Sequence, residues 1–264
     1  MDPLVCLIRR FVVEFMNGSN PSICHEIMDD GYQLRVGDQL ISGRDAHYIP
    51  AVRHQLDQFP GMGMTVHRLI STTDQIAVHF SEHGASGGPG GPVAAWQGIA
   101  LYRWNGSRLT GCAAEEDYFA RRRQLKSGIA DMIPPPAPAP WDASPEVADA
   151  DREQVVRQWL ATGMPSAGDR VVFDDGAPEI EFVDVEVAVN ELFSAGSAVA
   201  FHSRHLGQYR HGLPDAAATP SRVSMSSAGI VVVEDGAIAS GHVIRDRAGL
   251  VRSLVAAASG KLSL

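Results

Sequence analysis

Residues 133–144 read IPPPAPAPWDAS, and this proline-rich stretch decides how the chain is divided. Proline has no backbone N–H and a fixed φ, so such a run forms neither a helix nor a central strand and acts as a semi-rigid extended spacer. The whole chain has 264 residues, more than one hydrophobic core usually spans. We therefore predict a linker over 131–147 that joins a first domain over 1–130 to a second domain over 148–264.

The sequence before the linker has the pattern of helices followed by strands. Apolar residues recur at helical spacing over 4–16, and Asn20-Pro21-Ser22 starts a second, shorter helix. Asn105-Gly106 is typical of a tight turn between two strands. After the second helix, the elements expected in chain order are a strand pair within 32–41, a helix over 45–58, strands over 63–72, 75–83, 93–104 and 108–117, and a helix over 118–126.

After the linker the same order returns in a shorter form. The elements expected there are a helix over 149–161, strands over 170–174, 179–192, 197–209, 221–234 and 237–245, and a closing helix over 247–257. The second half has no counterpart of the helix over 45–58, so one wall of any cavity there is missing.

Short internal repeats support a duplication. AVHFSEHG at 77–84 resembles AVAFHSRH at 198–205, and GIAL at 98–101 resembles GIVV at 229–232. Asp235-Gly236 also holds the hairpin position that Asn105-Gly106 holds in the first half. Several matches in the same order predict two related α+β domains in tandem, the second shorter than the first.

Composition and charge exclude several classes of protein. The net charge is -9 and no basic run is present, so the chain is a poor candidate for binding nucleic acid. Its three cysteines are far apart, which predicts neither a disulfide framework nor a structural zinc site. Neither a signal peptide nor a membrane span is expected, so we predict a cytoplasmic protein. Only Lys126 and Lys261 are lysines among 22 basic residues, a bias typical of a GC-rich, bacterial genome.

The order of elements in the first half resembles the NTF2-like superfamily, also called the cystatin-like α+β cone. The closest resemblance is to its SnoaL-like polyketide cyclase and ketosteroid isomerase-like branch. The residues that carry it are Gly43-Arg44-Asp45, the FPGM motif at 59–62, Asp74, Arg103, and Asp117 followed by Gln124-Leu125. The resemblance implies helices packed on a curved, mostly antiparallel sheet that encloses a cone. It covers 5–126 well and 150–258 loosely.

The same resemblance implies that Asp117 is the general acid/base of a pocket in the first cone. A desolvated carboxyl with a raised pKa would suit that role, whereas an Asp117 that caps the helix after it would have a lowered pKa. His79 is a second candidate acid/base group, or a buried wall residue. Two departures weaken the match, since Ala113 replaces an aromatic residue and the isomerase base, expected near Arg35, is absent.

Further residues are candidates for binding a substrate or for a second site. Strand alternation places Trp96 and Tyr102 on one strand face, where they either line a pocket or pack in the core. The full set of substrate-binding candidates is His25, Tyr32, Trp96, Tyr102 and Glu115. Second-domain candidates are His202, His242 and Asp246, and we expect the flanking Arg245 and Arg247 to lower the pKa of Asp246. No metal site is expected, because His79 and His83 are about 13 Å apart on a strand.

These observations favour a SnoaL-like enzyme that works without a cofactor. It would catalyse acid/base cyclisation, isomerisation or hydration of a small apolar or polycyclic carbonyl compound in the first cone. The alternative is a non-catalytic ligand-binding or scaffold protein, and a weaker one is an epoxide hydrolase. A deep cone with an uncapped Asp117 would support the enzyme, and a cone filled by Trp96 and Tyr102 would support the alternative. We also expect the two domains to pack as a dimer-like unit within one chain, which could pair further as a homo-oligomer.

Overall fold

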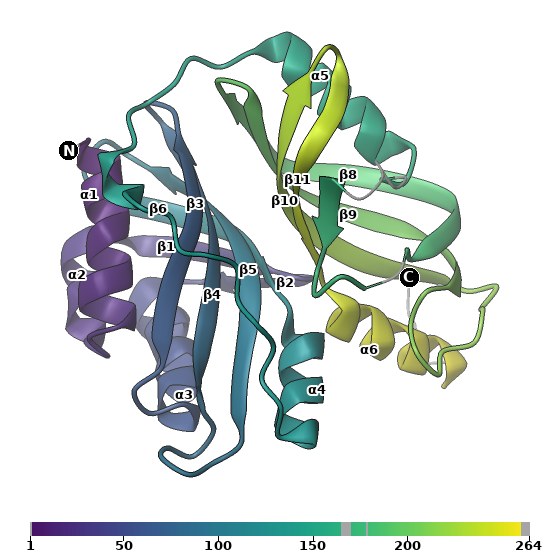
Figure 1. The fold of residues 1–264 in the computed structure, drawn as a ribbon, viewed down its shortest axis with the longest axis horizontal. Coiled ribbons are helices and arrows are strands. Elements are labelled where there is room, and N and C mark those ends of the chain that lie inside the picture. The colour runs from purple at the N-terminus through teal and green to yellow at the C-terminus, as the bar shows by residue number, and fades with distance from the viewer. Residues whose placement is uncertain (1, 165–169, 178, 260–264) are drawn as a thin grey trace.

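The first half of the chain packs helices against one face of a six-stranded sheet (Figure 1). The computed structural model describes residues 2–164, 170–177 and 179–259. The helices and helical turns of this half are α1 (Pro3–Arg10), η1 (Phe11–Met16), η2 (Pro21–Ile23), α2 (Cys24–Ile27), η3 (Arg44–Tyr48), α3 (Ile49–Gln58) and α4 (Tyr118–Ser127). Its strands are β1 (Met28–Val36), β2 (Gln39–Ser42), β3 (Gly63–Ser71), β4 (Gln75–Ala85), β5 (Val93–Trp104) and β6 (Leu109–Glu116).

The strand order of the first sheet is β2-β1-β6-β5-β4-β3. All neighbours are antiparallel except β1 and β6, which are parallel. Helices α1 to α3 cover the concave face, and the space between them and the sheet is the first cone. We call these elements together the first copy.

The second half repeats this plan with fewer elements. It consists of α5 (Ala150–Ala161), β7 (Val171–Phe173), β8 (Glu181–Ala195), β9 (Ala198–His211), β10 (Arg222–Glu234), β11 (Ala237–Arg245) and α6 (Arg247–Ala258). The order β7-β11-β10-β9-β8 matches β1-β6-β5-β4-β3, and again one pair, β7 with β11, is parallel. The predicted tandem of α+β cones with a shortened second member, the second copy, is confirmed. Among the described residues, β2 and α3 have no counterpart in it.

The repeated sequence motifs mark the same contact in both copies. Gly98 lies opposite Phe80 in the first sheet, and Gly229 lies opposite Phe201 in the second. A Cβ added to either glycine would lie 2.4 Å from the facing phenylalanine ring. The glycine therefore lets the aromatic ring lie across the neighbouring strand and reach the core of its cone.

The outer faces of the two sheets pack against each other. Side chains from both copies form one buried apolar cluster, which consists of Ile70, Ala77, Ile99, Leu101, Phe193, Ala195, Ala198, Ala200, Ala228, Ile230 and Ile244. Residues at odd positions of β4, such as Ala77, face this interface, and residues at even positions, such as Val78, face the first cone. Strand β4 thus has one face in the cone and one toward the second copy.

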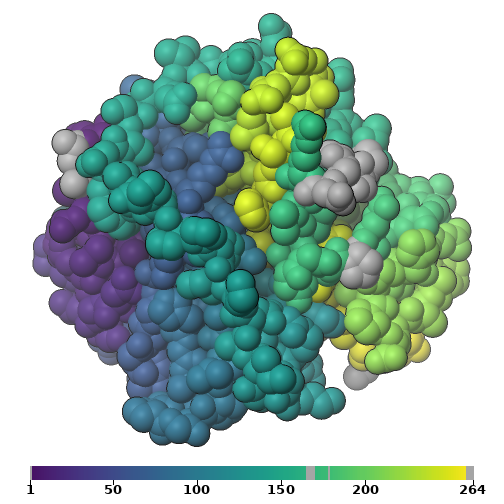
Figure 2. Space-filling model, in the orientation of Figure 1, coloured from purple at the N-terminus to yellow at the C-terminus, as the bar shows by residue number. Residues whose placement is uncertain are grey.

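The linker runs along the edge of the first sheet. The backbone N–H of Ala137 donates to the carbonyl of Val66, and that of Glu146 donates to the carbonyl of Ser71, both over 2.8 Å. Its one helical turn, η4 (Pro140–Asp142), also lies against β3. Figure 2 shows the linker as a surface band in teal across this side of the molecule. The linker covers the exposed edge of β3, which would otherwise present unpaired backbone groups.

No helix in the described part of the chain is long and apolar enough to cross a bilayer.

Candidate functional site

Aromatic side chains fill the first cone. Tyr32, Trp96 and Tyr102 are almost fully buried there. Tyr32 packs edge to face on Tyr48 with ring centroids 4.8 Å apart, and Phe59 from the end of α3 packs on Trp96 at 5.1 Å. These three predicted substrate-binding residues therefore lie in a packed core. By the criterion stated above, this filling supports a binding or structural role for the chain.

A pair of carboxyl groups, one buried and one partly buried, lies beside the aromatic side chains of this cone, and sequence reasoning missed it. Glu82 on β4 is 3% exposed and hydrogen-bonds to Glu116 at the end of β6. Gln55 of α3 donates to Glu82, and the indole N–H of Trp96 donates to Glu116 over 2.9 Å. Burial, and then the Glu116 charge, raise the pKa of Glu82 well above its ordinary value. The signal in the sequence was that Glu82 shares a strand face with Phe80.

Asp117 lies outside the first cone, which corrects our expectation. Its side chain points toward the second copy, because it shares a face of the chain with Ala113 and Glu115. Its Oδ1 accepts from the backbone N–H of Ala120, which caps α4, and its Oδ2 accepts from Arg247 over 2.6 Å. The capping alternative is thus what the structure shows, while a catalytic role of Asp117 stays a prediction.

The cap acts to lower the pKa of Asp117, as expected, but other effects outweigh it. Burial and the nearby Asp174 carboxylate raise it to about 7, against the opposing effect of Arg247. Asp174 itself is held by Arg245, whose backbone N–H and guanidinium both donate to it. A hollow of about 390 Å³ between the copies is lined in part by Asp117, Asp174 and Asp175.

His79 also faces the second copy and not the cone. Its Nε2 lies 2.8 Å from the Oε1 of Gln97, and its ring stacks on His242 with centroids 4.5 Å apart. His67 lies on its other side, at 5.1 Å. Burial lowers the pKa of His79 to about 3, so the ring is neutral near pH 7. The structure thus brings His79 and His242 together across the interface of the copies.

Glu115 and His202 form a second contact between the copies. The Nε2 of His202 lies 2.9 Å from the Oε1 of Glu115, which also accepts from the backbone N–H of Gly37. Burial raises the pKa of Glu115 well above its ordinary value and lowers that of His202 to about 4. His202 is therefore neutral near pH 7, and the contact is a buried hydrogen bond between the two sheets.

The two remaining candidates lie apart from the others. His25 is half exposed and pairs with Asp45 over 3.2 Å on the helical side of the first copy. Asp246 caps α6 through the backbone N–H of Gly249. Burial raises the pKa of Asp246, so the lowering that we expected from Arg245 and Arg247 is wrong. Those arginines instead bind the carboxylates around Asp117.

The second cone, in contrast, stays open. The repeats align Glu82 with Ser203 and Trp96 with Ser227, and both serines are small enough to hydrogen-bond each other across the sheet at 3.0 Å. Among the described residues of the second copy, no helix corresponds to α3, which carries Gln55 and is followed by Phe59 in the first copy. The residues that close the first cone are therefore absent from the second.

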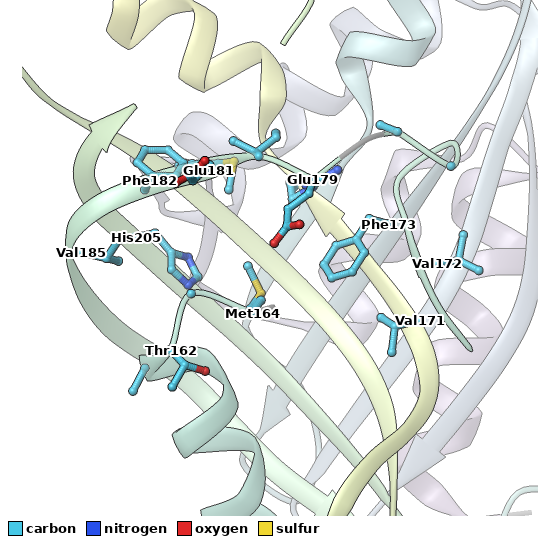
Figure 3. Close-up of a pocket in the computed structure, with 17 residues that line it drawn as sticks. Thr162, Met164, Val171, Val172, Phe173, Glu179, Glu181, Phe182, Val185 and His205 are labelled. Atoms are coloured by element: carbon cyan, nitrogen blue, oxygen red, sulfur yellow. The ribbon is translucent and has the colours of Figure 1, made fainter. Parts of the chain in front are cut away.

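A hollow of about 560 Å³ occupies the second cone (Figure 3). Its wall comes from the end of α5, from β7, from the segment before β8, and from the inner faces of β8 to β11. The apolar side chains that line it include Met164, Val171, Phe173, Ile180, Phe182, Val185 and Met225. A concave hollow that combines apolar side chains with placed polar groups is the usual form of a small-molecule site.

His205 is the buried imidazole of this hollow. It lies on β9, is 2% exposed, and is drawn in Figure 3 facing the space between Val185 and Met164. Neither of its ring nitrogens makes a hydrogen bond of normal geometry within the described ranges. Burial lowers its pKa to about 4, with the carbonyls of Leu160 and Met225 opposing that effect. A neutral imidazole can donate from one nitrogen and accept at the other.

Other polar groups of the hollow are exposed or already engaged. Glu179 and Glu181 are exposed at its rim. Arg245 is buried, but Asp174 binds its guanidinium over 2.7 Å, and Phe173 stacks on it at 4.9 Å. The arrangement can hold an apolar molecule and hydrogen-bond one polar group of it at His205. In the part of the chain that the structure covers, no cluster of three or more potential metal ligands occurs.

Several solved structures are similar to about half of this chain. A candidate SnoaL-like polyketide cyclase from Jannaschia sp. CCS1 is 17% identical, with 50% of this chain and 92% of that chain covered and a TM-score of 0.42. IdmH, a candidate polyketide cyclase from Streptomyces antibioticus, is 18% identical, with 48% and 99% covered and a TM-score of 0.42. An LEH-like epoxide hydrolase from Mycobacterium tuberculosis is 13% identical, with 47% and 85% covered and a TM-score of 0.40.

No protein-family model matches the sequence, and no curated protein matches it either. The identities to the solved structures are too low to transfer an activity. In strand order and in helix placement, the first copy nonetheless has the arrangement of helices on a mostly antiparallel sheet that the NTF2-like resemblance implies, and the second copy repeats it in shortened form.

Proposed function

We propose that this chain binds a small, largely apolar molecule in the second cone and holds a hydroxyl or carbonyl group of it at His205. One observation carries the proposal. A hollow of about 560 Å³ contains a buried imidazole whose ring nitrogens make no hydrogen bond of normal geometry with the described residues, although the carbonyls of Leu160 and Met225 lie close enough to act on its pKa. A buried polar group left unsatisfied costs about 1–3 kcal/mol, and a ligand that satisfies it recovers that energy.

The chemistry of His205 favours binding over catalysis in this hollow. A general base works best when its pKa lies near the working pH. Burial instead lowers the pKa of His205 to about 4, which makes it a weak base near pH 7. The polar groups that could assist it, Glu179 and Glu181, are exposed at the rim. Of the functions that the sequence left open, the non-catalytic ligand-binding protein is thus the better supported.

The second candidate function is acid/base catalysis at the hollow between the copies. A cofactor-independent cyclisation, isomerisation or hydration of an apolar carbonyl compound needs a group that can both give and accept a proton near pH 7. Asp117 lines this hollow and its pKa is raised to about 7. Its two hydrogen bonds, to Ala120 and Arg247, would have to loosen before it could reach a substrate.

The binding proposal is tested with two ligands that differ by one hydroxyl group, 2-naphthol and naphthalene. We expect 2-naphthol to bind about tenfold more tightly in an NMR titration, because only it can hydrogen-bond to His205. In the His205→Phe variant the ring stays flat and apolar, so this preference should vanish while naphthalene still binds.

The matched control is His54→Phe, on the exposed face of α3 in the first copy. It should leave both affinities unchanged. If the two ligands bind equally to the unaltered protein, or if His205→Phe keeps the preference for 2-naphthol, the role of His205 is wrong.

A further inference from the structure

The last helices of the two copies form a second apolar hollow, distinct from either cone. Helices α4 and α6 lie next to each other at the base of the molecule (Figure 1). Together with the loop Pro214–Thr219 they line a groove of about 1170 Å³. Its apolar side chains include Phe119 of α4, Val251, Leu254 and Val255 of α6, and Ala216 of the loop. Val255 is 62% exposed, so an occupant of this groove would cover apolar surface.

The rim of this groove is basic, although the chain as a whole is acidic. Arg122, Arg123 and Lys126 line it from α4, at positions that share one helix face, and Arg252 lines it from α6. The one lining carboxylate among the described residues is Asp215. With a net charge of -9 on the chain, this concentration of cations is a local exception.

These four basic side chains differ in whether they already form ion pairs. Arg123 is bound by Asp175 and Asp131, and Arg252 lies 3.5 Å from Asp246. Neither Arg122 nor Lys126 forms an ion pair with any residue in the described ranges. Both are exposed at the rim. They are therefore available to an anionic group of a ligand whose apolar part lies in the groove.

We infer that the groove between α4 and α6 binds a single-chain anionic amphiphile, a long-chain carboxylate, with its alkyl chain against Phe119 and Val255 and its carboxylate at Arg122 and Lys126. The basic rim favours an anionic head group by charge complementarity, and the apolar floor favours an alkyl chain. The second cone is a poor competitor for such a ligand, because its rim carries Glu179 and Glu181. The inference does not depend on the function proposed for that cone.

Decanoate and 1-decanol test this inference, since they share the chain length and differ in charge. We expect decanoate to bind more tightly, and its affinity to fall as salt is added. The double variant Arg122→Gln/Lys126→Gln should weaken decanoate by about fivefold or more and leave 1-decanol unchanged. In a second variant, Val255→Asp, the new carboxylate in the floor should abolish decanoate binding.

The matched control is Arg9→Gln/Arg53→Gln, which removes the same charge from exposed helix positions in the first copy. It should not change decanoate binding, and neither should His205→Phe. The inference is overturned if decanoate does not bind, if it binds equally well to the Arg122→Gln/Lys126→Gln variant, or if His205→Phe abolishes binding. It is also overturned if the protein does not bind decanoate but sediments with phosphatidylglycerol vesicles, since a membrane surface would then be the partner.

Discussion

Asp117 is a buried member of a charge cluster between the copies, which extends to exposed side chains. The cluster contains the carboxylates of Asp117, Asp131, Asp174 and Asp175 and the guanidinium groups of Arg123, Arg245 and Arg247. Four carboxylates thus face three guanidinium groups, so one carboxylate has no full partner. This imbalance, added to burial, explains why the pKa of Asp117 rises although Arg247 lies beside it.

The raised pKa predicts how stability changes with pH. The folded chain holds the Asp117 proton up to about pH 7, whereas the unfolded chain loses it near 3.8. The stabilisation is therefore complete below about pH 4 and falls by about 1.4 kcal/mol per pH unit up to pH 7. Asp117→Asn removes this dependence. Urea unfolding of both proteins from pH 5 to 8 measures the difference, and parallel curves would show that Asp117 titrates normally.

At the scale of the residue, the sequence identified side chains that are buried and polar, but not whether each of them faces the first cone or the second copy. Strand alternation placed Glu115 and Asp117 on one face of their strand and Trp96 and Tyr102 on one face of the neighbouring strand, and we expected all four in the first cone. It did not say which set faces the cone, because alternation is the same on both sides of a sheet. Glu82 and Glu116 were missed for that reason, since their environment depends on long-range packing.

At the scale of the element, each copy uses a glycine opposite a phenylalanine. Gly98 makes room for Phe80, and Gly229 makes room for Phe201. Because the ring in each pair is buried, it cannot move away freely from a new side chain.

Alanine at either glycine should therefore destabilise the fold. Gly98→Ala and Gly229→Ala each place a Cβ 2.4 Å from a ring atom, and we expect a loss of about 1–3 kcal/mol in the free energy of unfolding. Gly84→Ala on β4 is the control, because its Cβ would meet its nearest neighbours at 3.5 Å. Denaturant unfolding compares the three variants, and an equal effect of all three would contradict the account of the repeat.

The elements themselves were predictable from sequence. Asn105-Gly106 and Asp235-Gly236 fix two hairpins, and the strand expected over 93–104 is β5 with the same bounds. The open second cone was not predicted, although the missing helix was. Ser203 and Ser227 stand where Glu82 and Trp96 close the first cone, and small polar residues on a strand carry no signal of the space around them.

At the scale of the whole molecule, the two sheets share a core. Leu101 of the first copy is 2% exposed within the cluster that also contains Phe193 and Ile230 of the second. Sequence reasoning divided the chain at the linker but could not find these contacts, since each residue looks like an ordinary strand residue. That the copies behave as a dimer-like unit stays a prediction.

A shared core predicts that the copies unfold together. Leu101→Ala should cost about 2–5 kcal/mol and lower the melting temperature of the entire chain, which should melt in one calorimetric transition. Leu40→Ala is the control, at a position that is 50% exposed. Two separate transitions, only one of which shifts in Leu101→Ala, would show that the interface does not couple the copies.

The most direct test of the central claim is the ¹⁵N NMR spectrum of the imidazole rings during a titration with 2-naphthol. The account predicts that the ring nitrogens of His205 shift as one of them gains a hydrogen bond, while the indole N–H of Trp96 in the filled first cone stays in place. If the Trp96 signal moves and the His205 signals do not, the ligand enters the first cone and the assignment of the site to the second copy is wrong.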